Sequence, residues 1–158
     1  MTEKIKIVGT PARWNDDEFD NRLEDQVKLY RLTVASMELA RAPLPHDFLE
    51  LVAAKVADGY TISRKHAVTH EALHHACYMI KPPAMQQEDI AVIRARVKEE
   101  YIAHLESERA RYQDLLRQQL VQKQEEKERK AAETAKAKQL AQIEAEVQGC
   151  YSPLEIPA

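Results

Sequence analysis

The run from residue 84 to residue 148 contains no glycine and no proline, and it is rich in alanine, glutamate, lysine, glutamine, leucine and arginine. Because these six residue types are good helix formers, the run predicts one very long helix. At a rise of about 1.5 Å per residue, an unbroken helix of this length extends about 100 Å. It cannot fold back into a compact core of this chain. Such a helix pairs with another helix, bridges two bodies or presents a surface to a partner.

Composition favours a helical fold and excludes a general attraction to polyanions. Charged residues make up 31% of the 158 residues, aromatic residues make up 6%, and there are three glycines. These values favour an all-α protein over sheet-rich folds. The formal net charge is -3. Nucleic-acid binding would therefore have to rest on a local basic patch.

The cysteines and the hydropathy pattern predict a cytoplasmic protein. Cys77 and Cys150 lie far apart and form no CxxC pair, which suits two free thiols in a reducing compartment. The N-terminus has no apolar signal-peptide core, and no stretch approaches about eighteen apolar residues. We therefore expect no membrane span and no membrane partner.

A first helix is predicted from residue 15 to about residue 42. Asn15 and the three acidic residues after it are typical of an N-cap and a first turn. Six large apolar residues then recur every three or four positions and should form one buried seam. These residues are Phe19, Leu23, Val27, Tyr30, Val34 and Met37. The prolines that follow Ala42 should end the helix.

Two shorter helices should follow the first. Residues 47–58 carry an apolar face and stop at Gly59. Residues 63–80 begin with Ser63 as a cap and stop before two consecutive prolines. Residues 5–8 alternate and allow one short strand or an ordered arm. The predicted fold is therefore all-α: a bundle of three helices packed on a long, coiled-coil-like C-terminal helix, with at most one short N-terminal strand.

The same pattern divides the chain into four predicted segments. Beyond the apolar stripe of its first half, the long helix has no large apolar residue from 122 to 138. We therefore expect an N-terminal arm at 1–14, a helical bundle at 15–121 that includes the first half of the long helix, a projecting charged helix at 122–149 and a flexible tail at 150–158.

The most specific chemical motif is His70-Glu71-Ala72-Leu73-His74, which matches H-E-x-x-H. On a helix the two histidines lie one turn apart and can chelate zinc, while the glutamate acts as general base on metal-bound water. The pattern resembles the zincin metallopeptidase signature over these five residues. The resemblance implies a zinc-dependent hydrolase with Glu71 as the catalytic residue and His70 and His74 as metal ligands.

The surroundings of the motif depart from that family. Zincins place a bulky apolar residue where this chain has Ala72, and they set the site beside a sheet. A third ligand is also needed, and Glu100 is the candidate, with Glu99 and His104 as further choices on the same predicted helix. We therefore favour half-buried histidines at a helix edge and expect no metal and no other cofactor. The zinc-dependent hydrolase is kept as an alternative.

A nucleic-acid-binding regulator is the second alternative. Arg64 and Lys65 lie at the start of the predicted third helix, where they could contact phosphate. Arg94 and Lys98 could extend this patch along the long helix. The cluster is short and belongs to a chain with net negative charge, so a solvated helix start is the favoured interpretation.

The long helix regains an apolar stripe near its end, at Leu140, Ile143 and Val147. Three apolar residues are too few to hold a dimer alone, so together with the tail that follows they form a candidate docking element for a partner protein. A disordered terminus is the other interpretation, and for the end of the chain it is the one we favour. A homodimer should form instead through the apolar residues of 19–37 and 90–120.

These features together predict a non-catalytic helical interaction protein. It would act as an adaptor, inhibitor or assembly factor that binds a macromolecular partner, with protein favoured over nucleic acid. Small size, the lack of a cofactor motif and a projecting helix are also typical of accessory proteins of phages and other mobile elements.

Overall fold

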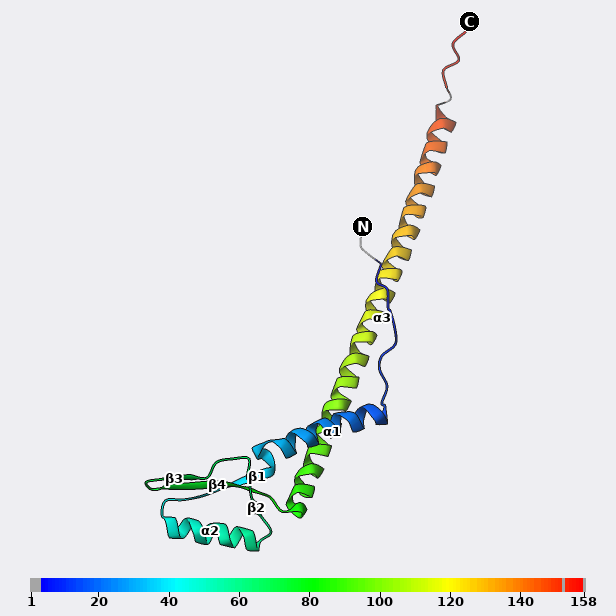
Figure 1. The fold of residues 1–158 in the computed structure, drawn as a ribbon. Helices are drawn as coiled ribbons and strands as arrows, with labels where there is room; N and C mark the ends of the chain where they lie inside the picture. Colours follow the sequence, from blue (N-terminus) through cyan, green and yellow to red (C-terminus); the bar gives the residue numbers. More distant parts are fainter. Residues whose placement is uncertain (1–3, 152, 158) are drawn as a thin grey trace. The chain divides into compact units, whose positions relative to one another are not determined.

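The computed structural model describes residues 4–151 and 153–157 and divides them into two units. One unit comprises residues 13–106, and the other comprises the described residues within 1–12 and 107–158. The elements, in chain order, are α1 (Asp16–Leu32), a 3-10 helix (Val34–Ser36), β1 (Met37–Ala42), α2 (Pro45–Ala57), β2 (Thr61–Ile62), β3 (Thr69–Glu71), β4 (His74–Ile80) and α3 (Pro83–Cys150) (Figure 1). The all-α prediction is wrong, because residues 37–80 contain a four-stranded antiparallel sheet.

The sheet is organised around β4. β1 pairs antiparallel with one edge of β4, with Met37 opposite Ile80. The other edge of β4 is shared by two short strands: β2 places Thr61 opposite Ile80, and β3 places Thr69 opposite Ala76. Because β1 and β2 both run antiparallel to the strand between them, the segment β1–α2–β2 is a crossover that returns to the far edge of the same sheet.

Helix α1 begins where it was predicted to begin but ends earlier. The Asn15 side chain accepts hydrogen bonds from the backbone N–H groups of Asp17 and Glu18, at 2.9 and 3.4 Å, which confirms the N-cap. The helix ends at Leu32 and does not continue to Ala42. The β1 residues are acceptable helix formers, but their backbone groups pair with β4. Tertiary pairing therefore overrides the local preference.

The predicted third helix over 63–80 is also wrong, because much of this segment forms the β3–β4 hairpin. The hairpin turns at Ala72 and Leu73, which are not typical turn residues. Leu73 has a φ of 56°, in the left-handed region that residues with a Cβ rarely adopt. No turn signal in the sequence marks this hairpin.

The predicted second helix is confirmed as α2, which lies along one face of the sheet (Figure 1). Pro45 occupies its first turn, where a missing N–H costs nothing. Gly59 follows its end with a φ of +94°, which glycine adopts without strain. The buried residues between α2 and the sheet are Ala40, Ala42, Phe48, Tyr60, Cys77 and Met79.

A second cluster joins α1 to the first part of α3. It contains Phe19, Val97 and Tyr101, with Leu23, Ile93 and Leu105 packed against it. The first part of the predicted seam, Phe19 and Leu23, therefore packs on the long helix of the same chain, whereas Val34 and Met37 lie outside α1. The side chains of this cluster are used within the fold, whereas Val34, Leu116 and Leu120 of the predicted dimer surface are 45%, 47% and 57% exposed. Dimerisation itself stays a prediction.

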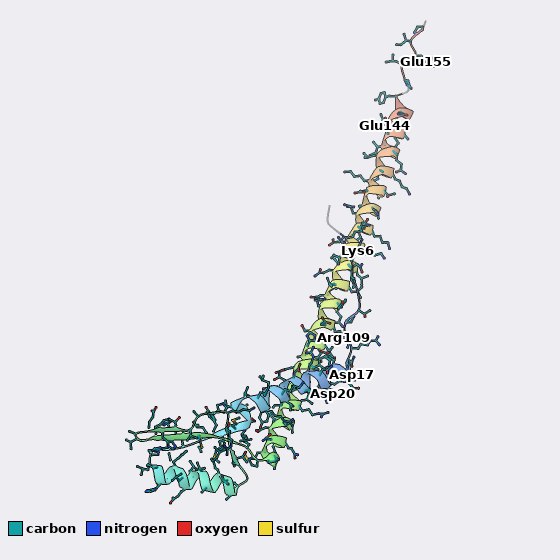
Figure 2. All side chains as sticks on the ribbon, viewed as in Figure 1. Lys6, Asp17, Asp20, Arg109, Glu144 and Glu155 are labelled. Carbon is teal, nitrogen blue, oxygen red and sulfur yellow. The ribbon has the colours of Figure 1, made fainter. Side chains whose placement is uncertain are left out.

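The long helix is confirmed as α3, which includes Gly149 instead of ending before it. Among the described residues, no helix combines the length and apolar character needed to cross a membrane. In the second unit, the arm of residues 4–8 lies alongside α3 (Figure 2, where Lys6 is labelled). The Ile5 N–H donates to the Gln122 side chain at 3.2 Å, and the Gln119 amide donates to the Ile5 carbonyl at 3.0 Å. The segment is thus an ordered arm without strand pairing.

Candidate nucleic-acid interface

The face of the sheet opposite α2 carries a mixture of apolar, aromatic and basic side chains. Successive residues of a strand point to opposite faces, so the positions between the core residues of β1 and β4 share this second face. The cross-strand pairs on it are Met37 with Ile80, Leu39 with Tyr78, and Arg41 with Ala76. Leu39 is 45% exposed and Arg41 is exposed. The face is therefore open to solvent around Leu39 and Arg41, whereas Met37 and Ala76 are buried.

A cavity of about 470 Å³ lies beside this face, within the size range of about 300–1,000 Å³ that is usual for ligand sites. Its apolar lining comes from Met37, Ile62 and Ile80. Its polar lining consists of Arg31, Ser36, Ser63, Arg64, Lys65 and Gln86. Three of these residues are cations and none is an acid, so the cavity suits an anionic ligand with an apolar part.

The three cations of the cavity have no partner carboxylate among the residues that the structure describes. Arg31, Arg64 and Lys65 take part in none of the ion pairs among the described residues. Lys81 of the same unit, by contrast, pairs with Asp89 at 2.7 Å. Like charges gathered without counter-charges repel one another and raise the local positive potential. A bound anion would relieve this repulsion.

The loop that carries Arg64 and Lys65 is anchored to β4. The Ser63 N–H donates to the Tyr78 carbonyl at 2.9 Å, and the buried Ser63 hydroxyl accepts from the Lys65 N–H at 3.4 Å. The same hydroxyl lies 3.1 Å from Nδ1 of His66. These bonds hold the backbone of the loop against the sheet while both basic side chains stay exposed.

An aromatic surface continues from the cavity along the open face. The His66 ring lies 4.9 Å from the Tyr78 ring, at an interplanar angle of 51°, and Tyr78 is half-buried. Leu39 lies opposite Tyr78, and Arg41 adds a fourth cation. We call this surface the basic face; it consists of Arg31, Leu39, Arg41, Arg64, Lys65 and Tyr78.

Several acidic residues lie on the side of the sheet that α2 covers, whereas Glu71, opposite His74 at the end of the β3–β4 hairpin, shares the other side with Tyr78. The acidic residues Asp47 and Glu50 belong to α2, which covers the opposite face. Glu38, also on that side by alternation, pairs with Lys55 at 2.6 Å. The hydrogen bonds from Lys55 and Tyr60 lower the pKa of Glu38, so this carboxylate stays ionised. A net negative chain can therefore present a local basic face.

The structure brings only part of the predicted nucleic-acid site together. Arg64 and Lys65 line the cavity, whereas Arg94 lies over the Phe19 ring at 5.6 Å. Lys98 is an exposed residue of α3 that does not line the cavity. Arg31, Arg41 and Tyr78 were missed because they are distant in sequence: Arg31 lies at the end of α1, and Arg41 and Tyr78 lie on paired strands. β4 itself carries no polar–apolar alternation in its sequence, HHACYMI, so no local signal marks Tyr78 as a surface ring.

The structure removes the helical basis of the zinc hypothesis. In the β3–β4 hairpin, Glu71 lies opposite His74, and His70 lies opposite His75. Adjacent positions of a strand face opposite ways, so His70 and His74 lie on different faces of the hairpin. Glu100, the proposed third ligand, pairs with Arg96 at 3.7 Å. The part of the chain that the structure describes contains no group of three or more metal-binding side chains.

The predicted docking residues lie on the distal part of α3. Leu140, Ile143 and Val147 are 58%, 56% and 51% exposed, and every side chain from 127 to 150 is exposed. Figure 2 shows side chains standing out from this stretch, with Glu144 labelled. The stripe is thus available to a partner.

Comparisons of the chain with protein-family models, with curated protein sequences and with solved structures found no match. The choice between functions therefore rests on the residues and geometry described above.

Proposed function

We propose that the protein is a non-catalytic macromolecule-binding protein whose basic face binds single-stranded nucleic acid. The observation that carries this proposal is the convergence of Arg31, Arg64 and Lys65 on a cavity beside an open sheet face, where none of the three pairs with a described carboxylate. A nucleic-acid strand presents one phosphate at each nucleotide, so several cations of such a cluster can each contact a phosphate of the same strand.

The aromatic part of the basic face favours a single strand over a duplex. The bases of a single strand can turn outward and stack on aromatic side chains, whereas the bases of a duplex are already stacked on one another. Tyr78 offers a ring next to the cationic cavity, and Leu39 offers an apolar surface opposite it. This combination of a stacking surface and flanking cations suits a base together with its phosphate.

The polar groups of the cavity support binding more than catalysis. Ser63 and His66 are in contact, but Ser63 is buried and its hydroxyl also accepts the Lys65 N–H. The Ser36 hydroxyl is likewise buried and donates to the Thr33 carbonyl at 3.1 Å. Both hydroxyls thus hold the local backbone, and neither is presented as a nucleophile.

Binding can be measured by fluorescence anisotropy with a labelled single strand of about twenty nucleotides. We expect affinity to fall steeply with salt, because log K for single strands changes by about 0.7 per neutralised phosphate for each log unit of salt. If four cations each neutralise one phosphate, the slope of log K against the logarithm of the salt concentration should be about -3. The double variant R64E and K65E should lose affinity by about tenfold or more and show a shallower slope.

The matched control is the double variant R94E and K98E, which changes the charge equally on α3. It should bind like the unaltered protein. The variant Y78L should lose affinity with little change in the salt slope, because it removes stacking and no charge. Equal binding by the R64E and K65E protein would refute the proposal. A duplex competing as well as the single strand would contradict the stacking part of it.

A second candidate function is the docking of a helical protein partner on the distal part of α3, as an adaptor, inhibitor or assembly factor would do. The observation that favours it is the exposed stripe of Leu140, Ile143 and Val147. A second copy of the chain is one such partner. Both candidate functions are compatible with a cytoplasmic protein, in which the free thiols of Cys77 and Cys150 stay reduced.

A further inference from the structure

The β3–β4 hairpin holds two histidines side by side, with their rings tilted by 55°, on the side of the sheet opposite the basic face. His70 and His75 occupy directly opposed positions of the two strands. Their Nδ1 atoms are 3.1 Å apart, and their ring centroids are 5.3 Å apart. Each ring therefore directs its Nδ1 atom toward the other ring, near the end of the hairpin.

The separation of the two nitrogens is close to that of two ligands on one metal ion. Zinc binds histidine nitrogen at about 2.0–2.1 Å with tetrahedral geometry, which places two ligand nitrogens about 3.3 Å apart. The same separation permits a hydrogen bond in which the Nδ1–H of one ring donates to Nδ1 of the other. A metal ion would replace that shared proton with only a small change in the distance between the nitrogens.

A buried aromatic residue holds both rings in place. The centroid of Phe48 lies 6.0 Å from that of His70 and 6.0 Å from that of His75, and Phe48 belongs to the core under α2. Side chains that are already positioned lose less conformational entropy when they bind a ligand. His70 is exposed and His75 is half-buried, so an ion can reach the pair from solvent.

We propose that His70 and His75 bind a divalent transition-metal ion across the β3–β4 hairpin. The bound ion belongs to the class of metals that bind imidazole nitrogen, such as Zn²⁺, Ni²⁺ or Cu²⁺. Water completes the coordination, because the two rings are the only histidine, cysteine, aspartate or glutamate side chains that the described structure brings together there. The ion links β3 to β4 and stabilises the hairpin.

The pair differs from the one that the H-E-x-x-H motif names. That motif combines His70 with His74, which lie on different faces of the hairpin. The proposed site keeps His70 but exchanges its partner for His75, and it assigns no role to Glu71. The two pairings therefore make opposite predictions for substitutions at positions 74 and 75.

Isothermal titration with ZnCl₂, on full-length protein prepared without a histidine tag, tests the site. We expect one ion to bind per chain, and we expect a melting temperature that rises with Zn²⁺ concentration, because the ion binds the folded state. The variants H70Q and H75Q should each lose this binding. H74Q should bind as the unaltered protein does, and Mg²⁺ should not bind, because it prefers oxygen ligands.

Nitrogen NMR of the histidine rings provides a readout that needs no substitution. Addition of Zn²⁺ should shift the Nδ1 signals of His70 and His75 and leave those of His74 in place. Because His75 is half-buried, circular dichroism of H75Q should be compared with that of H70Q, whose exposed side chain can be replaced without disturbing the core. Zn²⁺ binding that survives in H70Q, or that is lost in H74Q, would overturn the proposal.

Discussion

At the scale of single residues, Asp89 links three elements of the larger unit. The Tyr30 hydroxyl of α1 donates to its carboxylate at 2.5 Å, and Lys81, between β4 and α3, bonds to the same oxygen at 2.7 Å. The hydrogen bond from Lys81, together with that from Tyr30, lowers the pKa of Asp89. Burial and the neighbouring carboxylate raise the pKa of Tyr30. The ionised form of Asp89 therefore stabilises the fold.

The variant D89N should be less stable than the unaltered protein at pH 7, by about 1.5 kcal/mol, because the hydrogen bonds from Tyr30 and Lys81 lose their charged acceptor. A carboxyl group whose pKa is lowered on folding stabilises the protein above its unfolded pKa of about 3.9 and loses this effect as pH falls through the folded pKa. The difference between the two proteins should therefore shrink below about pH 4. Urea unfolding of both proteins at pH 7 and at pH 3 measures this difference in the free energy of unfolding.

Asp20 offers a matched control on α1 (Figure 2). It is exposed and takes part in no ion pair of the described residues, so D20N should unfold like the unaltered protein at both pH values. If D89N showed the same loss of stability at pH 3 as at pH 7, ionisation of Asp89 would not be the cause.

At the scale of elements, β4 is the part of the sheet on which the core depends. It is the central strand, and its alternation directs Cys77 and Met79 toward α2 while Tyr78 faces the basic face. Burial raises the pKa of the Cys77 thiol, so this residue serves packing and is a poor nucleophile at neutral pH. One strand therefore supplies both the centre of the core and the ring of the candidate binding site.

Truncation of the β4 core residue Met79 should destabilise the protein far more than truncation on the open face. Met79 is fully buried at 0% exposure, so M79A should lower the free energy of unfolding by about 2–5 kcal/mol through lost burial and a residual cavity. L39A, on the open face of β1, should cost less than about 1.5 kcal/mol. Chemical denaturation of both variants compares the two faces directly. If M79A and L39A lowered the free energy of unfolding by the same amount, the face of the sheet that carries Leu39 would be covered and not open.

At the scale of the whole molecule, the two candidate functions belong to different units. The basic face is built from residues 31–80 of the unit 13–106, and the distal stripe of α3 lies in the other unit. Changes confined to the stripe leave every contact of the basic face intact. Nucleic-acid binding and protein docking should therefore be separable by substitution.

The triple variant L140E, I143E and V147E should lose protein partners and keep nucleic-acid binding. Charged residues at these positions make burial of the stripe unfavourable. The control is Q139E, Q142E and Q148E, which adds the same charge to the same stretch of α3 and should keep its partners. Affinity capture from the native cell with mass spectrometry, together with the anisotropy assay, measures both effects. The docking proposal fails if the triple variant retains the partners of the unaltered protein.

The sequence alone determined the elements that local signals specify. The cap at Asn15, the helix-forming composition of 84–148 and the boundaries around α2 predicted three helices, because N-caps, prolines, glycines and apolar spacing act over a few residues. Arg64 and Lys65 were found for the same reason: they are adjacent in the chain.

Only the tertiary structure decided the sheet and what lies on its two faces. The β1 residues could form a helix, and no turn residue marks the β3–β4 hairpin at Leu73, so pairing with β4 selected the strand conformation. In the paired strands, side chains on one face recur every two residues, whereas in the predicted helix they would recur every three or four. The pairing brings Arg41 and Tyr78 to the basic face and gives His70 a partner, His75, that the motif in the sequence does not name.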